Sequence, residues 1–354
     1  MQRPDITIVV PVHDKERPIR RAVESILLDE RAIPLVIAHN LQPAELDLPA
    51  DPRVRVVELA GSKGMPGACF DLGIAEAETE WVGIMGSDDW FEQGALAAMR
   101  KRAATDGADA VIAPLKNQGT PSNVIRPLTL RKKNLRAARD RVFYRTAPLG
   151  IYKTAVMRKP EYRFGAVFPA GSDMRVTAAL WTSGHKVSYY WNDPAYVVGA
   201  DAKTRVTFTP RPLDFTGAPY LGLFEEDAVK RFSAAEKHAL AVKMVNVHVM
   251  SAVMLRPNKS DWQGNDFVWL CDYVEKLKQF DPRLHRAISR RDRWILQALY
   301  ERNIDMLVEA NQRRLHARMW NKLLPVNVFW ALADRQAALR LAIVGVLAAR
   351  STRF

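Results

Sequence analysis

The sequence predicts an α/β fold with a mainly parallel sheet, followed by a helical C-terminal domain. In the first part of the chain, short apolar runs alternate with segments of helical periodicity, which is the pattern of successive βαβ units. A stretch with three prolines and two glycines follows at residues 206–222, and it is typical of a linker. Beyond it the apolar spacing is that of helices.

The β-branched run at residues 6–10 predicts a first strand, buried on both faces. We expect this strand to stop at Pro11, because proline cannot donate into a ladder. Apolar residues then follow one face of a helix at residues 19–27, and Pro18 is placed to start it. The next expected elements are strands at 35–38, 54–59 and 81–85 and helices at 67–77 and from Ala95.

The pattern is less regular after residue 108. Strands are expected at 111–114 and 187–191, and a helix at 172–184 that ends in glycine. Residues 240–255 are apolar nearly all round, which predicts a buried helix, and residues 304–315 predict a helix with one apolar face. We therefore expect a first domain at 1–206, a linker at 207–224 and a helical domain at 225–354.

Composition places the chain among ordinary globular proteins, with 48% apolar and 26% charged residues in a length of 354. Cys69 and Cys271 lie in apolar surroundings without metal or redox spacing, so we expect buried thiols in a reducing compartment. The N-terminus lacks the apolar region of a signal peptide, and no apolar run approaches the roughly 18 residues of a membrane span. These features predict a cytoplasmic protein.

The formal charge of +13 implies an anionic partner, such as nucleotide phosphates, a polyanionic acceptor, nucleic acid or an anionic membrane face. Nucleic acid is the least favoured of these, because no RNA-recognition, zinc-finger or helix-turn-helix signature accompanies the charge. The basic residues are concentrated at the end of the chain. From Arg313 onwards there are eight Lys and Arg and one acid, Asp334.

Two adjacent carboxylates, Asp88 and Asp89, follow the predicted strand at 81–85. Ligands of open parallel sheets bind beyond the carboxyl ends of the strands. Paired carboxylates at that place suit a hard divalent cation that also contacts substrate phosphates. The alternative is that Ser87 or Asp88 only caps the following helix, since both types are preferred N-caps.

Three motifs occur in a characteristic order. They are Pro11-Val-His13-Asp at the end of the first strand, a glycine-containing loop at 61–67 before a helix, and Gly86-Ser-Asp-Asp. Their order and spacing resemble the family 2 glycosyltransferases of GT-A fold, over roughly residues 5–206. The resemblance implies a Rossmann-like domain that binds a nucleotide sugar. Residues 207–354 have no counterpart in it.

The resemblance also implies an inverting transfer of a sugar, most often from a UDP-sugar, to a hydroxyl of a cell-surface glycan, an anionic cell-wall polymer or a lipid-linked acceptor. Mn²⁺ or Mg²⁺ held by Asp88 and Asp89 would neutralise the diphosphate leaving group. Asp173 matches the family's general base, and its alternative role is to cap a helix together with Ser172. The residues implied in donor binding are Pro11, His13, Asn40, Lys63, Gly67, Asp71 and Asp88.

Several positions depart from the family pattern. Gly86 replaces the first Asp of the motif, and Asn40 stands where the family usually has an Asp for the uracil. Phe70 occupies a usual Arg position, which weakens the diphosphate grip unless Lys63 or another basic residue compensates. Further on, Ser172 replaces a Glu, and Asp71 an Asn. These departures motivate an alternative hypothesis, a non-catalytic glycosyltransferase-like subunit.

The basic end of the chain also carries aromatic and aliphatic residues, as helices lying at an anionic lipid surface do. This pattern predicts a peripheral position at the inner face of the cell membrane. Packing on the helical domain or an oligomer contact would use the same residues, which are Trp320, Leu323, Leu324, Phe329, Trp330 and Leu332.

Overall fold

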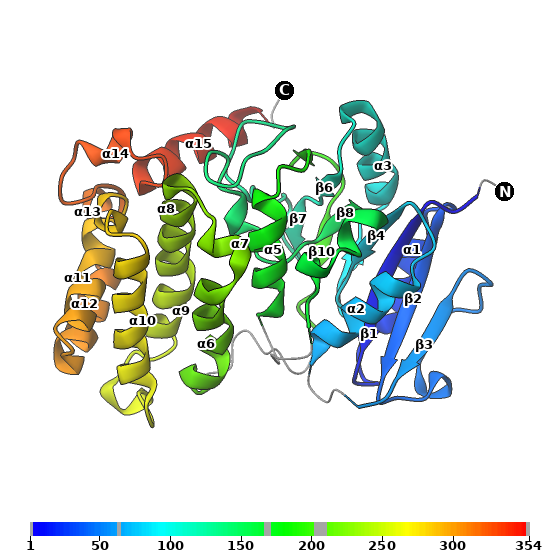
Figure 1. The fold of residues 1–354 in the computed structure, drawn as a ribbon, viewed down its shortest axis with the longest axis horizontal. Coiled ribbons are helices and arrows are strands. Elements are labelled where there is room, and N and C mark those ends of the chain that lie inside the picture. Colours follow the sequence, from blue (N-terminus) through cyan, green and yellow to red (C-terminus); the bar gives the residue numbers. More distant parts are fainter. Residues whose placement is uncertain (1–2, 62–64, 166–170, 202–210, 352–354) are drawn as a thin grey trace. The chain divides into compact units, whose positions relative to one another are not determined.

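The computed structural model describes residues 3–61, 65–165, 171–201 and 211–351 (Figure 1). The chain forms two units. The first comprises Met1–Arg126, Arg131–Arg136 and Arg145–Thr204, and the second comprises Pro127–Leu130, Ala137–Tyr144 and Arg205–Phe354. Two short segments, 127–130 and 137–144, therefore belong to the helical unit. The predicted division into 1–206, 207–224 and 225–354 places both in the first domain.

A seven-stranded sheet organises the first unit, in the order β3-β2-β1-β4-β8-β6-β9. All neighbours are parallel except β8, which is antiparallel to β4 and β6. The predicted mainly parallel α/β architecture is thus confirmed. The strands are β1 (Ile6–Val12), β2 (Ala32–His39), β3 (Arg55–Leu59), β4 (Trp81–Ile84), β6 (Ala110–Ile112), β8 (Gly150–Lys153) and β9 (Val187–Tyr189).

The expectation that the first strand stops at Pro11 is wrong, because β1 continues to Val12 and pairs with β2 over its whole length. Pairing of β1 with β4 ends at Val9, whose carbonyl accepts from the Met85 N–H at 2.9 Å. Successive residues of a strand direct their backbone N–H and C=O groups to its two neighbours in turn. Val9 and Pro11 therefore face the same side, that of β4, and β4 no longer pairs with β1 at Pro11. The missing N–H costs no ladder bond there.

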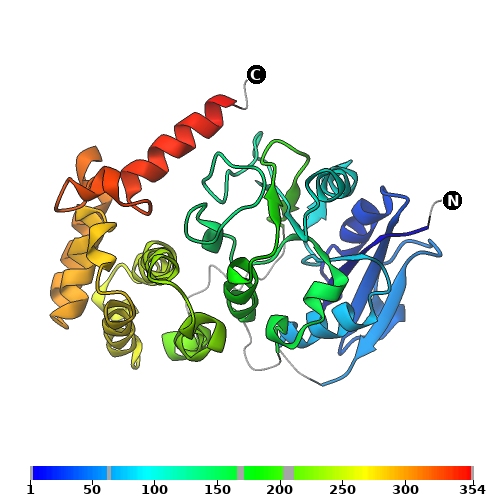
Figure 2. The same cartoon turned by 45° about the horizontal axis from the view of Figure 1, so that its top comes forward.

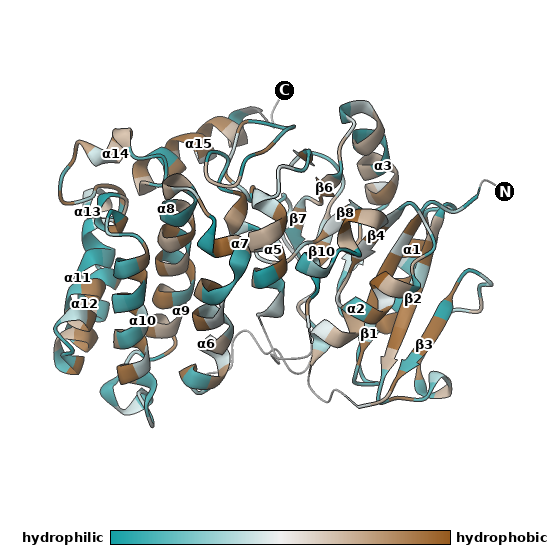
Figure 3. Cartoon of the chain, viewed as in Figure 1, coloured by the Kyte–Doolittle hydropathy of each residue, from teal (hydrophilic) through white to brown (hydrophobic). Residues whose placement is uncertain are grey.

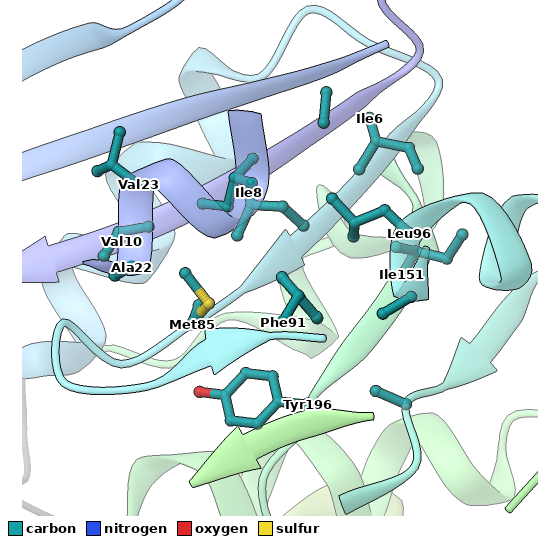
Figure 4. Close-up of a cluster of buried hydrophobic side chains, with 14 of the residues drawn as sticks. Ile6, Ile8, Val10, Ala22, Val23, Met85, Phe91, Leu96, Ile151 and Tyr196 are labelled. Carbon is teal, nitrogen blue, oxygen red and sulfur yellow. The ribbon is translucent and has the colours of Figure 1, made fainter. Parts of the chain in front are cut away.

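Helices cover the sheet and complete the core of the first unit. They are α1 (Ile19–Leu27), α2 (Pro66–Glu76), α3 (Ala95–Asp106), α4 (Thr154–Met157) and α5 (Ser172–Thr182). A second sheet, in the order β5-β10-β7, consists of β5 (Trp90–Phe91), β7 (Leu115–Asn117) and β10 (Tyr196–Val198). In Figure 4, Tyr196 from β10 faces Met85 and Phe91 within the same apolar cluster. The rings of Phe91 and Tyr196 pack edge to face, with their centroids 5.4 Å apart.

The second unit is helical. Its longer helices are α6 (Leu213–Gly222), α8 (Ala234–Lys243), α10 (Asp266–Phe280), α11 (Arg290–Tyr300), α12 (Ile304–Leu315) and α15 (Ala338–Ser351). Its shorter ones are α7 (Asp227–Lys230), α9 (Met250–Met254), α13 (Met319–Leu323) and α14 (Trp330–Ala333). The helices α6, α8 and α10 run side by side in both views (Figures 1 and 2). The predicted buried helix at 240–255 is present, with a π-helical segment at Met244–Val249 between α8 and α9.

The predicted linker at 207–224 is wrong for much of its length, because α6 occupies residues 213–222. One of the glycines that suggested a linker, Gly217, has a packing role instead. A Cβ at Gly217 would lie 2.1 Å from the Trp269 ring, so the glycine lets α6 approach α10 closely. Tertiary packing here overrides a composition that disfavours a helix.

Both cysteines are buried and unpaired with each other, as predicted. Burial raises the pKa of each thiol to about 11, so both stay protonated at neutral pH. Apolar character is strongest along the central strands of the first unit (Figure 3). Among the described residues, no helix combines the length and the apolar character needed to cross a membrane.

Candidate active site

The loop Gly86–Asp89 begins just after β4, at the edge where β1 and β4 end side by side. Tyr196 of β10 organises this loop: its hydroxyl accepts from the Gly86 N–H at 3.0 Å and donates to Asp89 Oδ2 at 2.5 Å. The Gly199 N–H donates to the other oxygen, Asp89 Oδ1, at 2.8 Å. Burial, and after it the negative charge of Asp89, raise the pKa of the Tyr196 hydroxyl well above its ordinary value. The hydroxyl therefore keeps its proton and remains a donor.

Both carboxylates approach the same space above Gly86. A Cβ added at Gly86 would lie 2.7 Å from Asp89 Oδ2 and 3.3 Å from Asp88 Oδ1. The glycine therefore leaves room for two carboxylates where a side chain would displace them. This explains physically why a residue without a side chain can stand at the first position of the motif.

Asp88 is oriented by two arginines of the segment that follows β1. Arg17 Nη1 lies 2.8 Å from Asp88 Oδ2, and Arg21 Nη2 donates to the Asp88 carbonyl at 2.6 Å. The Arg21 guanidinium also stacks over Trp90, 4.0 Å from the ring centroid. The helix-cap alternative for Ser87 and Asp88 is wrong, because α3 begins at Ala95 with Gly94 as its N-cap.

A cavity of about 280 Å³ joins the two predicted catalytic regions. Asp89 lines it from the loop after β4, and Asp173 lines it from the first turn of α5. The N-cap of α5 is Gly171 and makes no side-chain capping hydrogen bond, so the alternative that Ser172 and Asp173 cap this helix is wrong. The cavity is lined by Pro66, Phe70, Ile84, Met85, Gly86, Asp89, Ala147, Leu149, Gly171, Ser172, Asp173 and Tyr196.

The first turns of α2 form one wall of this cavity. Asp71 accepts from the N–H groups of Phe164 and Gly165, both at 2.8 Å, and so holds the chain that leads towards α5. A Cβ at Gly67 would lie 2.2 Å from the Gly165 carbonyl oxygen, so this position also requires close backbone contact. Phe70 lines the cavity and contacts the Phe164 ring at 5.1 Å, which makes the wall apolar where the family usually has an Arg.

The other predicted donor-binding residues lie along the ends of β1 and β2. Pro11 and His13 are at the end of β1, and desolvation together with the positive Arg17 lowers the pKa of His13. Both amide atoms of Asn40 are engaged by Gly61: Nδ2 donates to its carbonyl at 3.1 Å, and Oδ1 accepts from its N–H at 2.9 Å. Lys63 lies outside the described residues. The contacts of these residues with a donor stay predictions.

The carboxylates fit a divalent cation, but they cannot enclose it. A carboxylate has about four lone-pair sites, so the hydrogen bonds made by Asp89 are compatible with metal ligation. In the described part of the chain, no group of three or more His, Cys, Asp and Glu side chains could hold a metal. A cation at Gly86 would therefore depend on phosphate and water ligands as well, which is how Mg²⁺ is usually bound.

Sequence reasoning missed three residues that build the site, Tyr196, Gly199 and Arg17. Tyr196 and Gly199 lie in the short run Tyr-Val-Val-Gly, which resembles the end of the family's catalytic domain, but the resemblance assigns no role to either residue. Arg17 is one of several basic residues before α1, and nothing local distinguishes it. Their importance arises from contacts across the fold.

Comparison with known proteins shows which family and which fold the chain resembles. Residues 7–163 match the family model described as Glycosyl transferase family 2. The succinoglycan biosynthesis protein ExoO of Rhizobium meliloti is 32% identical over 114 residues, which cover 31% of this chain and 32% of that protein. The match thus spans about a third of the length of this curated relative.

Solved structures extend the likeness to most of the chain. The crystal structure of S. aureus TarS 1-349 superposes with a TM-score of 0.66 at 15% identity, over 89% of this chain and 92% of that one. The same protein in complex with UDP-GlcNAc superposes with a TM-score of 0.67, over 88% and 92%. At such identity the likeness concerns the fold. The family match thus concerns residues 7–163, and the likeness over most of the chain shows a GT-A fold followed by helices.

Proposed function

We propose that the chain is an inverting glycosyltransferase that transfers a sugar from a nucleotide sugar of the UDP-sugar class to an acceptor hydroxyl. The single observation that carries the proposal is that Asp89 and Asp173 line one cavity from different elements. A single displacement needs a stabilised leaving group on one side of the sugar and a general base on the other. Asp173 would act as the base, and a cation held by Asp89 would stabilise the leaving group.

Each side chain has a defined task in this proposal. Asp173 accepts the proton of the incoming hydroxyl from its position in the first turn of α5. Asp89, with Asp88 beside it, would hold Mn²⁺ or Mg²⁺ and so position the diphosphate end of the donor through the cation. When bound, that cation neutralises the charge that develops on the departing diphosphate. Arg17 supplies a positive charge next to Asp88. The family's usual Arg, which would also supply one, is replaced by Phe70 in this chain.

The donor and acceptor classes rest on the relatives. UDP and UDP-GlcNAc are bound in solved structures of TarS, and ExoO is named for succinoglycan biosynthesis. We infer a UDP-sugar donor and a cell-surface glycan, an anionic polymer or a lipid-linked molecule as acceptor. The chain would act in the cytoplasm, peripherally at the inner face of the membrane.

Asp173→Asn and Asp89→Asn test the chemistry. Purified full chain is incubated with a panel of UDP-sugars and Mn²⁺, and released UDP is measured with and without candidate acceptors. Losing the general base should lower kcat about 10²- to 10⁴-fold. Asp305→Asn is the matched control, because this exposed carboxylate lies in the helical unit and pairs with Lys259 on the surface.

The outcomes separate the hypotheses. Full activity in both site variants would contradict the assignment of Asp89 and Asp173. Wild-type chain that binds a UDP-sugar but never releases UDP would indicate the non-catalytic subunit. Unchanged melting temperatures of the variants show that any loss is chemical and not structural.

A further inference from the structure

Exposed apolar side chains gather at the end of the helical unit. Fifteen large apolar side chains are exposed in the described residues, and ten of them lie between Leu315 and Leu347. Phe329 is 64% exposed, Leu332 62% and Trp320 48%. We call residues 318–332, which comprise α13, the following loop and most of α14, the docking segment (Figures 1 and 3).

The backbone of the docking segment is held in place, so its apolar side chains are exposed in an ordered conformation. The Arg290 N–H donates to the Leu324 carbonyl at 2.9 Å, and its guanidinium donates to the Pro325 carbonyl at 3.2 Å. Asn327 accepts from the Phe329 N–H at 3.1 Å and closes a turn. Val326 and Val328 flank this turn and are 59% and 55% exposed. Little conformational entropy would remain to be lost when such a surface binds.

Basic groups accompany these side chains. The Arg318 guanidinium lies 5.2 Å from the Trp320 ring centroid, and that of Arg286 lies 4.3 Å from the Trp330 ring centroid. Asp334 is the only acid from Arg313 to the end of the sequence. It is buried, and His238 Nε2 lies 2.9 Å from its Oδ2. The local field of the docking segment is therefore positive.

We propose that the docking segment binds an anionic lipid surface, with Phe329, Leu332 and their apolar neighbours inserted among the acyl chains and Arg318 and Lys322 at the headgroups. Tryptophans and basic side chains around exposed aliphatic groups have the chemistry of interfacial membrane binding. A second copy would bring like charges together across a symmetric contact. Nucleic acid would leave the exposed valines and leucine without apolar partners.

The test is flotation of the full chain with two kinds of vesicle, phosphatidylcholine alone and an equal mixture with phosphatidylglycerol. We expect binding to the anionic vesicles that weakens at high salt. Phe329→Ser/Leu332→Ser should lower the partition coefficient at least about tenfold. Arg318→Gln/Lys322→Gln should lower it by about fivefold for each charge removed. Leu28→Ser is the matched control, because this leucine is 63% exposed in the first unit, and it should bind like wild type.

Three results would overturn the proposal. They are no flotation with anionic vesicles, flotation unaffected by the apolar variant, and a wild-type dimer that this variant dissociates without any vesicle binding. The last result would identify a contact between copies. If Phe329→Ser/Leu332→Ser misfolds, Val326→Ser/Val328→Ser tests the same surface through two exposed side chains of the loop. Because the readout is lipid binding, the result is independent of whether the proposed transferase activity is found.

Discussion

Asp89 owes its orientation to hydrogen bonds from groups that lie more than a hundred residues further along the chain. Tyr196 and Gly199 hold its two oxygens, and the Tyr196 hydroxyl also serves the Gly86 N–H. Removing the hydroxyl leaves these two half-buried groups without that partner, which costs up to about 1–3 kcal/mol. The function of the site thus depends on a tyrosine that does no chemistry itself.

Tyr196→Phe should raise the Mn²⁺ concentration needed for half-maximal UDP release several-fold, with a smaller change in kcat. The physical reason is that the Asp89 carboxylate loses its hydroxyl donor and becomes less well oriented. Tyr190→Phe is the matched control, because its hydroxyl donates to Asp106 outside the cavity. A metal titration that is identical for Tyr196→Phe and wild type would contradict the positioning role.

Gly86→Ala should lower kcat/KM at least about tenfold, since the new methyl would lie within 2.7 Å of Asp89 Oδ2 and force the carboxylate to move. Gly345→Ala tests the same substitution in α15, where the nearest atom to an added Cβ lies at 3.6 Å. That control should leave activity unchanged. Steady-state UDP release measures both variants, and a fully active Gly86→Ala chain would show that the close approach above Gly86 is dispensable.

Among the elements, α8 is tied to two later parts of the helical unit by one histidine. His238 Nδ1 lies 2.5 Å from Asp281 Oδ2 after α10, and Nε2 lies 2.9 Å from Asp334 Oδ2 after α14. Although burial opposes the charge, the two carboxylates raise the pKa of His238 to about 9. The pKa values of Asp281 and Asp334 are lowered, with His238 favouring their charged forms against burial.

His238→Gln should destabilise the chain most between pH 3.8 and 6.5, by about 3 kcal/mol. The raised histidine pKa contributes stability that is complete below 6.5 and is lost as the pH rises through about 9. The lowered carboxyl pKa values contribute stability above 3.8 that is lost as the pH falls through their folded values. Urea unfolding of wild type and variant across this range measures the difference, and a pH-independent difference would contradict the charged triad.

At the scale of the whole molecule, a donor that binds the folded chain and not the unfolded chain must stabilise the folded state by mass action. A UDP-sugar at a hundred times its Kd should stabilise the site-bearing unit by about 2.7 kcal/mol. A thermal-shift series of nucleoside diphosphates and their sugars with Mn²⁺ measures this and ranks the bases. Asp89→Asn should abolish most of the shift, whereas Asp305→Asn should keep it. A shift of equal size in both variants would place the donor elsewhere.

Much of the fold could be predicted because strands buried on both faces carry their own signal. The runs in β1, β2 and β4 are continuous and apolar, so neighbours along the chain suffice to mark them. The antiparallel β8 and the helix α6 could not be predicted in this way. The first reads Gly-Ile-Tyr-Lys and so lacks a continuous apolar run, and the second contains Pro219 and is stabilised by its fit against α10.

For the site, the sequence by itself determined which acids are available and the order in which the chain delivers them. Asp88 and Asp89 follow a strand and Asp173 begins a helix, and these are local facts. Only the tertiary structure decided that Asp89 and Asp173 share a cavity and that Gly61 occupies the amide of Asn40. The physical reason is that such contacts join residues far apart in sequence, and their distances follow from how sheet and helices pack, which no local pattern encodes.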